Sequence, residues 1–145
     1  MNTLEGGCLC GEQRYKILAK PISQGICYCK QCRKSGGAEG SPMLVVESHA
    51  FECEKKGLHY FETQSNRGTV VKRYFCPKCA SPLFSTLSDI QEILTVKASS
   101  LDDSKGFYPE YLVWTKSALN CTSFTLGVPR FEESAPFTHI VGRHR

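Results

Sequence analysis

Apolar and polar positions alternate with a period close to two along much of the 145-residue chain. Six segments of about five to eight residues are rich in β-branched and aromatic side chains and are bounded by Gly, Pro, Asn, Asp or Ser. These segments are residues 12–17, 42–46, 58–63, 68–75, 92–98 and 110–115. Because successive side chains of a strand point to opposite faces, the pattern predicts β-strands. Many short strands at close spacing predict a mainly β fold, either a sandwich or barrel-like.

Helical signals are weak in this chain. No segment combines a sustained apolar stripe of helical period with capping residues, and only short helical turns are expected, near residues 30–33 and 99–103. The segment from residue 129 onward has no clear period, and we expect it to wrap the surface. The length suits one domain that buries its own core, so we predict a single domain over residues 1–145.

Seven of the nine cysteines fall into three tight clusters. The clusters are Cys8 with Cys10, Cys27 with Cys29 and Cys32, and Cys76 with Cys79. A closed structural zinc site takes four protein ligands, whereas a catalytic zinc has three protein ligands and an open position. Two pairs can make one closed site, and the triplet can make an open one. The sequence therefore predicts two zinc sites with different roles.

The two cysteine pairs suit the closed site. Cys76 and Cys79 form a C-x-x-C turn, which brings two sulfurs within reach of one ion. Cys8 and Cys10 can hold a metal from one side, because residues i and i+2 of a strand share a face. A shared zinc would tie the N-terminal strand to the middle of the domain and contribute on the order of 10 kcal/mol to folding. The alternative is that either pair is simply two buried cysteines.

The cysteine triplet suits the open site. Lys30, Arg33 and Lys34 place positive charge beside it, which lowers thiol pKa values and attracts an anionic substrate. The backbone N–H groups of residues 35–37 could hold a carboxylate.

Two other groupings of the cysteines remain open. Cys53 or Cys121 could add a fourth sulfur to the triplet and close it into a second structural site. The triplet could also combine with Cys76 and Cys79 in a ribbon-type module. Isolated cysteines, however, are more often small core or surface residues than ligands.

Charge and hydropathy limit which binding partners and which cellular compartment we expect for the protein. The formal charge is +4, and binding of two zinc ions by seven thiolates would bring it to about +1. Basic residues are scattered apart from the pairs 55–56 and 72–73 and the end 143–145, so we expect no nucleic-acid partner. Neither a membrane-spanning run nor a signal peptide is evident. We therefore expect a cytoplasmic protein whose clustered cysteines bind metal, and the sequence leaves self-association open.

The cysteine clusters and their neighbours resemble the glutathione-dependent formaldehyde-activating enzyme family. The motifs that carry the resemblance are residues 6–11, 27–37, 73–79, 81–84, 101–103 and 129–132, together with Pro109 and Lys116. The likeness covers most of the chain. Ala80 and Ser99 stand where that family usually has Gly, and the His that often follows two residues after the Pro is missing after Pro109.

The resemblance implies a fold, a metal content and an activity. The implied fold consists of several small antiparallel sheets in an Mss4-like (β-tent) arrangement around a structural zinc. The implied ligands are Cys8, Cys10, Cys76 and Cys79 for that structural zinc and Cys27, Cys29 and Cys32 for a labile, catalytic-type zinc. The implied activity is that of a carbon–sulfur lyase, similar to S-(hydroxymethyl)glutathione synthase, which makes or breaks the adduct of glutathione and formaldehyde.

A non-catalytic function is the alternative. In that interpretation the chain is a zinc-stabilised binding module whose second metal is structural or vestigial. No general base stands out in the sequence: His49 and His59 are more typical of surface histidines, and the pair Asp102 and Asp103 is more typical of a turn.

Overall fold

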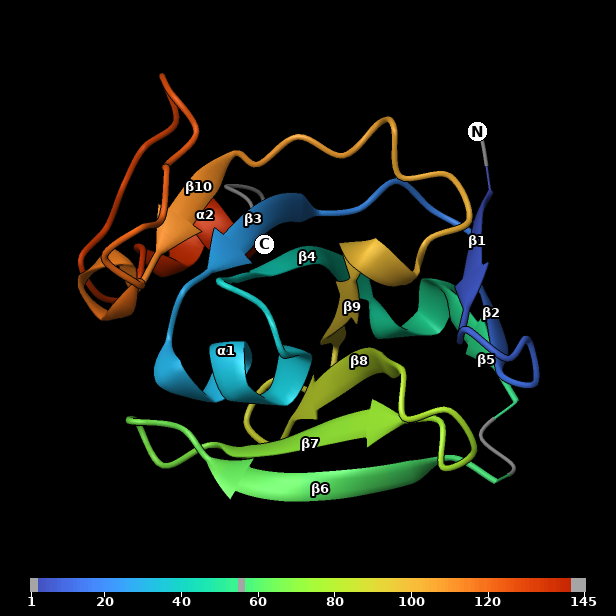
Figure 1. The fold of residues 1–145 in the computed structure, drawn as a ribbon. Helices are drawn as coiled ribbons and strands as arrows, with labels where there is room; N and C mark the ends of the chain where they lie inside the picture. Colours follow the sequence, from blue (N-terminus) through green and yellow to red (C-terminus); the bar gives the residue numbers. More distant parts are fainter. Residues whose placement is uncertain (1–2, 55–56, 142–145) are drawn as a thin grey trace.

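The strands of the protein form two sheets. The computed structural model describes residues 3–54 and 57–141, and within them one sheet has three strands in the order β1-β2-β5. The other has seven strands in the order β10-β3-β4-β9-β8-β7-β6 (Figure 1). The prediction of a mainly β fold is confirmed. Neither sheet of the described residues closes into a barrel, and the Mss4-like arrangement stays a prediction.

Almost all neighbouring strands are antiparallel. The small sheet consists of β1 (Leu4–Gly7), β2 (Arg14–Ile17) and β5 (Phe51–Cys53). The large sheet consists of β3 (Ser23–Cys27), β4 (Ser41–Glu47), β6 (His59–Gln64), β7 (Val70–Phe75), β8 (Pro82–Leu87), β9 (Ile93–Lys97) and β10 (Tyr111–Val113). The exception is β10, which pairs with β3 in parallel. The expected several small sheets are thus one small sheet and one large sheet.

The period-two pattern gives the large sheet two different faces. One face carries the buried side chains of Leu44, Phe84 and Val96, which pack with Tyr15 and Ile17 of the small sheet. This cluster is the largest core of the protein. In Figure 1 the small sheet stands at one end of the large sheet, with β6 to β8 below and β3, β4 and β10 above.

The opposite face of the large sheet is covered by helices. Helix α1 (Lys30–Gly36) begins after Cys29, whose sulfur accepts the backbone N–H of Cys32 at 3.3 Å, and it ends at Gly37, which has a left-handed φ of 65°. The expected turn near 30–33 is therefore part of a longer helix. The expected turn near 99–103 is the 3₁₀ helix Ala98–Ser100. No helix of the described residues is long and apolar enough to cross a membrane.

The segment after residue 129 does more than wrap the surface. Arg130 forms an isolated bridge with Leu112 of β10, and helix α2 (Phe137–Val141) follows. Ala135 and Val141 are buried against the same face of the sheet as α1. The segment therefore supplies core residues. These were not predicted, because the segment has no regular hydrophobic period. The basic groups at 55–56 and 143–145 lie outside the described residues.

Candidate metal centres

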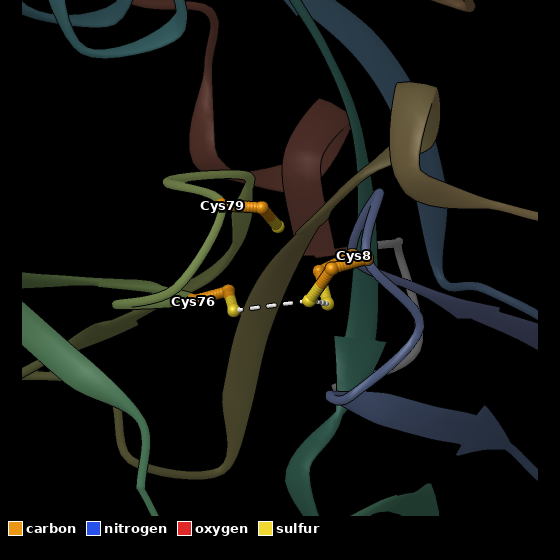
Figure 2. Close-up of side chains that lie close together, drawn as sticks. Cys8, Cys76 and Cys79 are labelled. Carbon is orange, nitrogen blue, oxygen red and sulfur yellow. Dashed lines mark hydrogen bonds between the residues drawn. The ribbon is translucent and has the colours of Figure 1, made fainter.

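Four cysteines from two distant loops meet at one point. Cys8 and Cys10 lie in the loop between β1 and β2, and Cys76 and Cys79 lie in the loop between β7 and β8. Their four Sγ atoms lie within 4.8 Å of one another. Figure 2 shows the sulfurs of Cys8, Cys76 and Cys79 pointing toward the same small space. We call these four residues the tetrathiol cluster.

The sulfur spacing in the tetrathiol cluster fits a zinc ion. The Sγ atoms of Cys8 and Cys10 are 3.4 Å apart, and those of Cys10 and Cys76 are 3.8 Å apart. With Zn–S bonds of about 2.3 Å, a regular tetrahedron has sulfur atoms about 3.8 Å apart. The donor set consists of four sulfurs and no carboxylate, and such a set binds zinc in preference to hard cations. The residues present therefore fit this metal.

Tight turns hold the four sulfurs in place. The backbone N–H of Gly11 donates to the carbonyl of Cys8 at 3.0 Å, and Gly11 has a φ of 82°. On the other side, Ala80 N–H donates to the Cys76 carbonyl at 2.7 Å, and Ala80 has a φ of 63°. A left-handed conformation is costly for any residue with a Cβ atom. This explains physically why Gly is better suited than Ala to the position after a C-x-x-C turn.

The thiols of the tetrathiol cluster cannot all ionise by themselves. A hydrogen bond with Ser81 lowers the pKa of Cys79 to about 5. The backbone of Glu12 acts to lower the pKa of Cys10, but the neighbouring thiols, first that of Cys8, raise it to about 12. One sulfur therefore carries the charge at the expense of another, as expected for like charges at short range. A divalent cation removes this conflict, because it stabilises all thiolates together.

Three further cysteines meet on the helix-covered face of the large sheet. Cys27 ends β3, Cys29 caps α1, and Cys32 lies in the first turn of α1. Their Sγ atoms lie within 4.8 Å of one another, and Cys27 is only 7% exposed. We call them the trithiol cluster. Hydrogen bonds with Cys27 and Cys32 lower the pKa of Cys29 to about 2, whereas hydrogen bonds with Cys29 and Cys32 raise the pKa of Cys27.

The trithiol cluster has no fourth protein ligand among the residues that the structure describes. Cys53 lies opposite Tyr15 in the small sheet, and Cys121 is exposed with its sulfur 3.9 Å from a carboxylate oxygen of Glu39. Neither belongs to a cysteine cluster, so both are wrong as candidate fourth ligands. The ribbon-type grouping is also wrong, because Cys76 and Cys79 lie with Cys8 and Cys10. The three sulfurs thus leave one side of a four-coordinate metal open.

Cavities lie on two sides of the trithiol cluster. One has a volume of about 220 Å³ and is lined by Cys27 and Cys32, and the other has a volume of about 320 Å³ and is lined by Cys29. Trp114 lines both cavities and has a left-handed φ of 58°. Such a conformation in a bulky residue is uncommon and is often found at functional sites. The place of Trp114 at these cavities could not be predicted from the sequence.

The charged residues at these cavities differ from those expected. Lys30 lines the cavity beside Cys29, as its position next to that residue suggested. Arg33 and Lys34, however, line neither cavity. Arg73 lines both, and Lys97 lines the cavity beside Cys27. Both residues lie in predicted strands, and Arg73 also begins the motif 73–79, but the sequence did not predict that either would line a cavity.

Gln31 forms hydrogen bonds that join helix α1 to the hairpin of β6 and β7. Its Nε2 donates to the backbone carbonyl of Gln64 in β6 at 2.9 Å. Its Oε1 accepts from the hydroxyl of Thr63 at 3.1 Å and from Nη2 of Arg73 at 3.2 Å. Gln31 lies between Cys29 and Cys32, so these bonds fix the helical turn that carries two of the three sulfurs.

The residues considered as general bases lie elsewhere. His49 is largely exposed and its Nε2 is 2.7 Å from a carboxylate oxygen of Glu47. His59 of β6 packs against Phe75 of β7, and Asp102 pairs with Arg14. None of these side chains lines either cavity at the trithiol cluster.

Comparison with known proteins decides the family. A family model described as glutathione-dependent formaldehyde-activating enzyme matches residues 3–117, a range that includes all seven clustered cysteines. The chain belongs to this family. A curated relative from Halomonas elongata, which carries the provisional name of a glutathione-dependent formaldehyde-activating enzyme, is 30% identical over 120 residues. The match covers 74% of this chain and 71% of that relative.

A solved structure shares the fold of this family member. The crystal structure of a Rhodobacter sphaeroides protein aligns with a TM-score of 0.54 and 18% identity. The alignment covers 88% of this chain and 98% of that protein. At this identity the likeness concerns the fold alone.

Proposed function

We propose that the protein is a zinc-dependent carbon–sulfur lyase that acts on the adduct of a small thiol and an aldehyde. Glutathione and formaldehyde are the substrate pair that the family name suggests. Zinc held by Cys27, Cys29 and Cys32 is the proposed reaction centre. We propose a second, structural zinc on Cys8, Cys10, Cys76 and Cys79, in a single domain over residues 1–145.

One observation carries the proposal. The trithiol cluster brings three sulfurs together without a fourth protein ligand among the described residues, and it borders two cavities. Catalytic zinc sites have three protein ligands and an open position, whereas structural sites have four. The contrast between the two clusters of the same chain therefore supports a catalytic role for one of them.

The net reaction needs only bond exchange and one proton transfer. In the direction of synthesis, a bond forms between the thiol sulfur and the aldehyde carbon, and the π bond of the carbonyl breaks. The proton of the thiol ends on the former carbonyl oxygen, so no oxidant or reductant is required. When bound, zinc lowers the pKa of a thiol or polarises a carbonyl oxygen, and both effects favour this addition.

The surrounding elements of the protein hold the three cysteine side chains in place. Cys29 and Cys32 are held by the first turn of α1, which Gln31 fixes against β6 and β7. Cys27 is buried at the end of β3, next to Val113 in the parallel pair with β10. Trp114 lines both cavities beside the cluster. Rigid placement of the reacting groups is what lowers the entropic part of the barrier.

A reducing, cytoplasmic location fits this function. None of the nine cysteines is in a disulfide, although seven of them lie in close clusters. Thiols in such clusters persist in reducing compartments, where glutathione is also abundant. We therefore propose glutathione as the partner and the cytoplasm as the compartment.

The experiment that tests the proposal is an exchange measurement by NMR. Glutathione and formaldehyde at equilibrium exchange with their adduct, and the zinc-loaded protein is expected to accelerate this exchange in proportion to its concentration. Cys29→Ser should abolish the acceleration. Cys121→Ser is the matched control, since Cys121 is exposed and belongs to neither cluster. An exchange rate that the protein does not change would reject the lyase and favour a binding module.

A further inference from the structure

The cavity beside Cys27 and Cys32 has a polar floor that the proposed reaction does not explain. Arg73 of β7 lies opposite Ser85 of β8, and Ser85 lies opposite Thr95 of β9. Lys97 is two residues further along β9, so it points to the same face of the sheet. These four residues all line the cavity of about 220 Å³. The register thus brings two cations and two hydroxyl groups to one side of the trithiol cluster.

The hydroxyl groups of this floor lack partners in the protein. Ser85 is 8% exposed, and neither its side chain nor that of Thr95 forms a hydrogen bond with the described residues. Both hydroxyl oxygens are accessible from the cavity, because neither is among the fully buried side-chain atoms that lack a hydrogen-bond partner. These hydroxyl groups can therefore form hydrogen bonds with a ligand or water in the cavity.

The two cations are also without acidic partners in the described part of the chain. Lys97 donates to Oγ of Ser41 at 2.5 Å, which leaves two of its N–H groups for another acceptor. Arg73 donates to Gln31 and Thr63, but to no carboxylate. The ionisable groups that act most on Lys97 are the trithiol cysteines and Arg73. Two partly buried cations beside one cavity favour an anionic ligand.

The rest of the cavity limits the size and nature of that ligand. Apolar side chains, including Met43, Val45, Val71 and Leu87, form much of the wall. At about 30 Å³ for each water, the volume equals roughly seven waters, which suits a ligand part of about six to eight non-hydrogen atoms. A whole tripeptide is larger than this, so only a part of glutathione, the proposed substrate, would enter the cavity. The space fits a short carbon chain with an anionic end.

We infer that this cavity is a carboxylate subsite for the thiol substrate. Lys97, with Arg73 and Ser85, binds the carboxylate, while the sulfur at the other end of a short carbon chain reaches the trithiol cluster. The site therefore selects thiols that carry a carboxylate a few bonds from sulfur over neutral thiols of equal length. The inference rests on the proposed function only for the statement that the ligand is a thiol.

A pair of small thiols tests the subsite directly. The affinity of the zinc-loaded protein is measured by calorimetry for 3-mercaptopropionate and for 3-mercapto-1-propanol, which differ in the carboxylate. We expect the carboxylate to bind about 10-fold to 100-fold more tightly, the usual effect of a charge-assisted hydrogen bond. Lys97→Met should remove this preference, and Lys97→Arg should retain part of it. Zinc content is measured in each variant.

Lys72→Met is the matched control for the loss of a positive charge. Lys72 is in β7 next to Arg73, but it lies on the opposite face of the sheet, with Nζ 3.8 Å from a carboxylate oxygen of Glu62. It should leave the preference for the carboxylate unchanged.

The possible outcomes separate this inference from the lyase. Equal affinity of the unmodified protein for the two thiols would overturn the subsite, whatever the exchange assay gives. An equal loss of both affinities in Lys97→Met would also overturn it, because Lys97 would then only balance the charge of the thiolates. A carboxylate preference that depends on Lys97, in a protein that does not accelerate adduct exchange, would support the subsite and reject the lyase.

Discussion

The Sγ atoms of Cys10 and Cys76 lie 3.8 Å apart, although 66 residues separate them in the chain. One belongs to the loop between the first two strands of the small sheet, and the other belongs to a loop of the large sheet. A metal at this point joins the two sheets where the backbone does not. The tetrathiol cluster is therefore expected to determine stability rather than reactivity.

Removal of one sulfur from this cluster should destabilise the protein. Cys76 is fully buried, and Cys76→Ser should lower the free energy of unfolding by on the order of 5 kcal/mol through loss of a structural zinc. Thermal unfolding followed by circular dichroism, with zinc analysis of the same samples, measures this. Cys121→Ser should change the stability by less than about 0.5 kcal/mol. Equal stability of the two variants would contradict the structural role.

A single substitution after the C-x-x-C turn should stabilise the protein. Ala80 has a φ of 63°, a region that costs a non-glycine residue about 1–2 kcal/mol. Ala80→Gly should therefore raise the free energy of unfolding by about 0.5–1 kcal/mol, after the entropic cost of Gly is subtracted. Ala38→Gly, at an exposed position without a positive φ, should instead destabilise slightly. Chemical denaturation of both variants at fixed zinc content tests the difference, and a loss of stability in Ala80→Gly would refute the strain argument.

The polar contacts of Gln31 should tune metal affinity at the trithiol cluster. Gln31→Ala removes the hydrogen bonds to Gln64, Thr63 and Arg73 that hold the first turn of α1. We expect about a 10-fold weaker zinc affinity at this cluster, as is usual when groups that orient metal ligands are lost. Competition with a coloured chelator measures the affinity, and hydrogen exchange of the α1 amides reports the loosening.

Lys34→Ala is the control for this change. Lys34 is exposed on the same helix and forms none of these bonds. If Gln31→Ala and Lys34→Ala gave the same zinc affinity, Gln31 would have no role in positioning the cluster.

The sequence predicts the strands and cysteine groupings that depend on residues close together in the chain, and it misses those that depend on tertiary packing. β7 and β9 are rich in β-branched residues and match the predicted segments 68–75 and 92–98 closely. β3 was missed because Gly25 interrupts its apolar pattern. The ring of Tyr111 covers Gly25 so closely that a Cβ atom there would lie 2.1 Å from it, so only tertiary packing explains this strand. β8 was missed because it begins at Pro82, beside a register shift in β7.

The residues around the trithiol cluster could be predicted only in part. Spacing alone grouped Cys27, Cys29 and Cys32, since three sulfurs within six residues can approach one another in a short turn. Arg73 and Lys97 were not found, because their place at the cavity depends on the pairing of β7, β8 and β9. Trp114 was not found either, because no local sequence signal predicts a left-handed tryptophan.

The lability of zinc tests the difference between the two clusters most directly. Purified protein is mixed with a chelator that changes colour on binding zinc, and release is followed with time under native conditions. We expect two zinc ions per chain, one released rapidly while the fold is retained and one released only on unfolding. Cys29→Ser should lose the rapid phase alone. Two zinc ions released at the same slow rate, or a Cys29→Ser variant that keeps the rapid phase, would contradict an open three-cysteine centre.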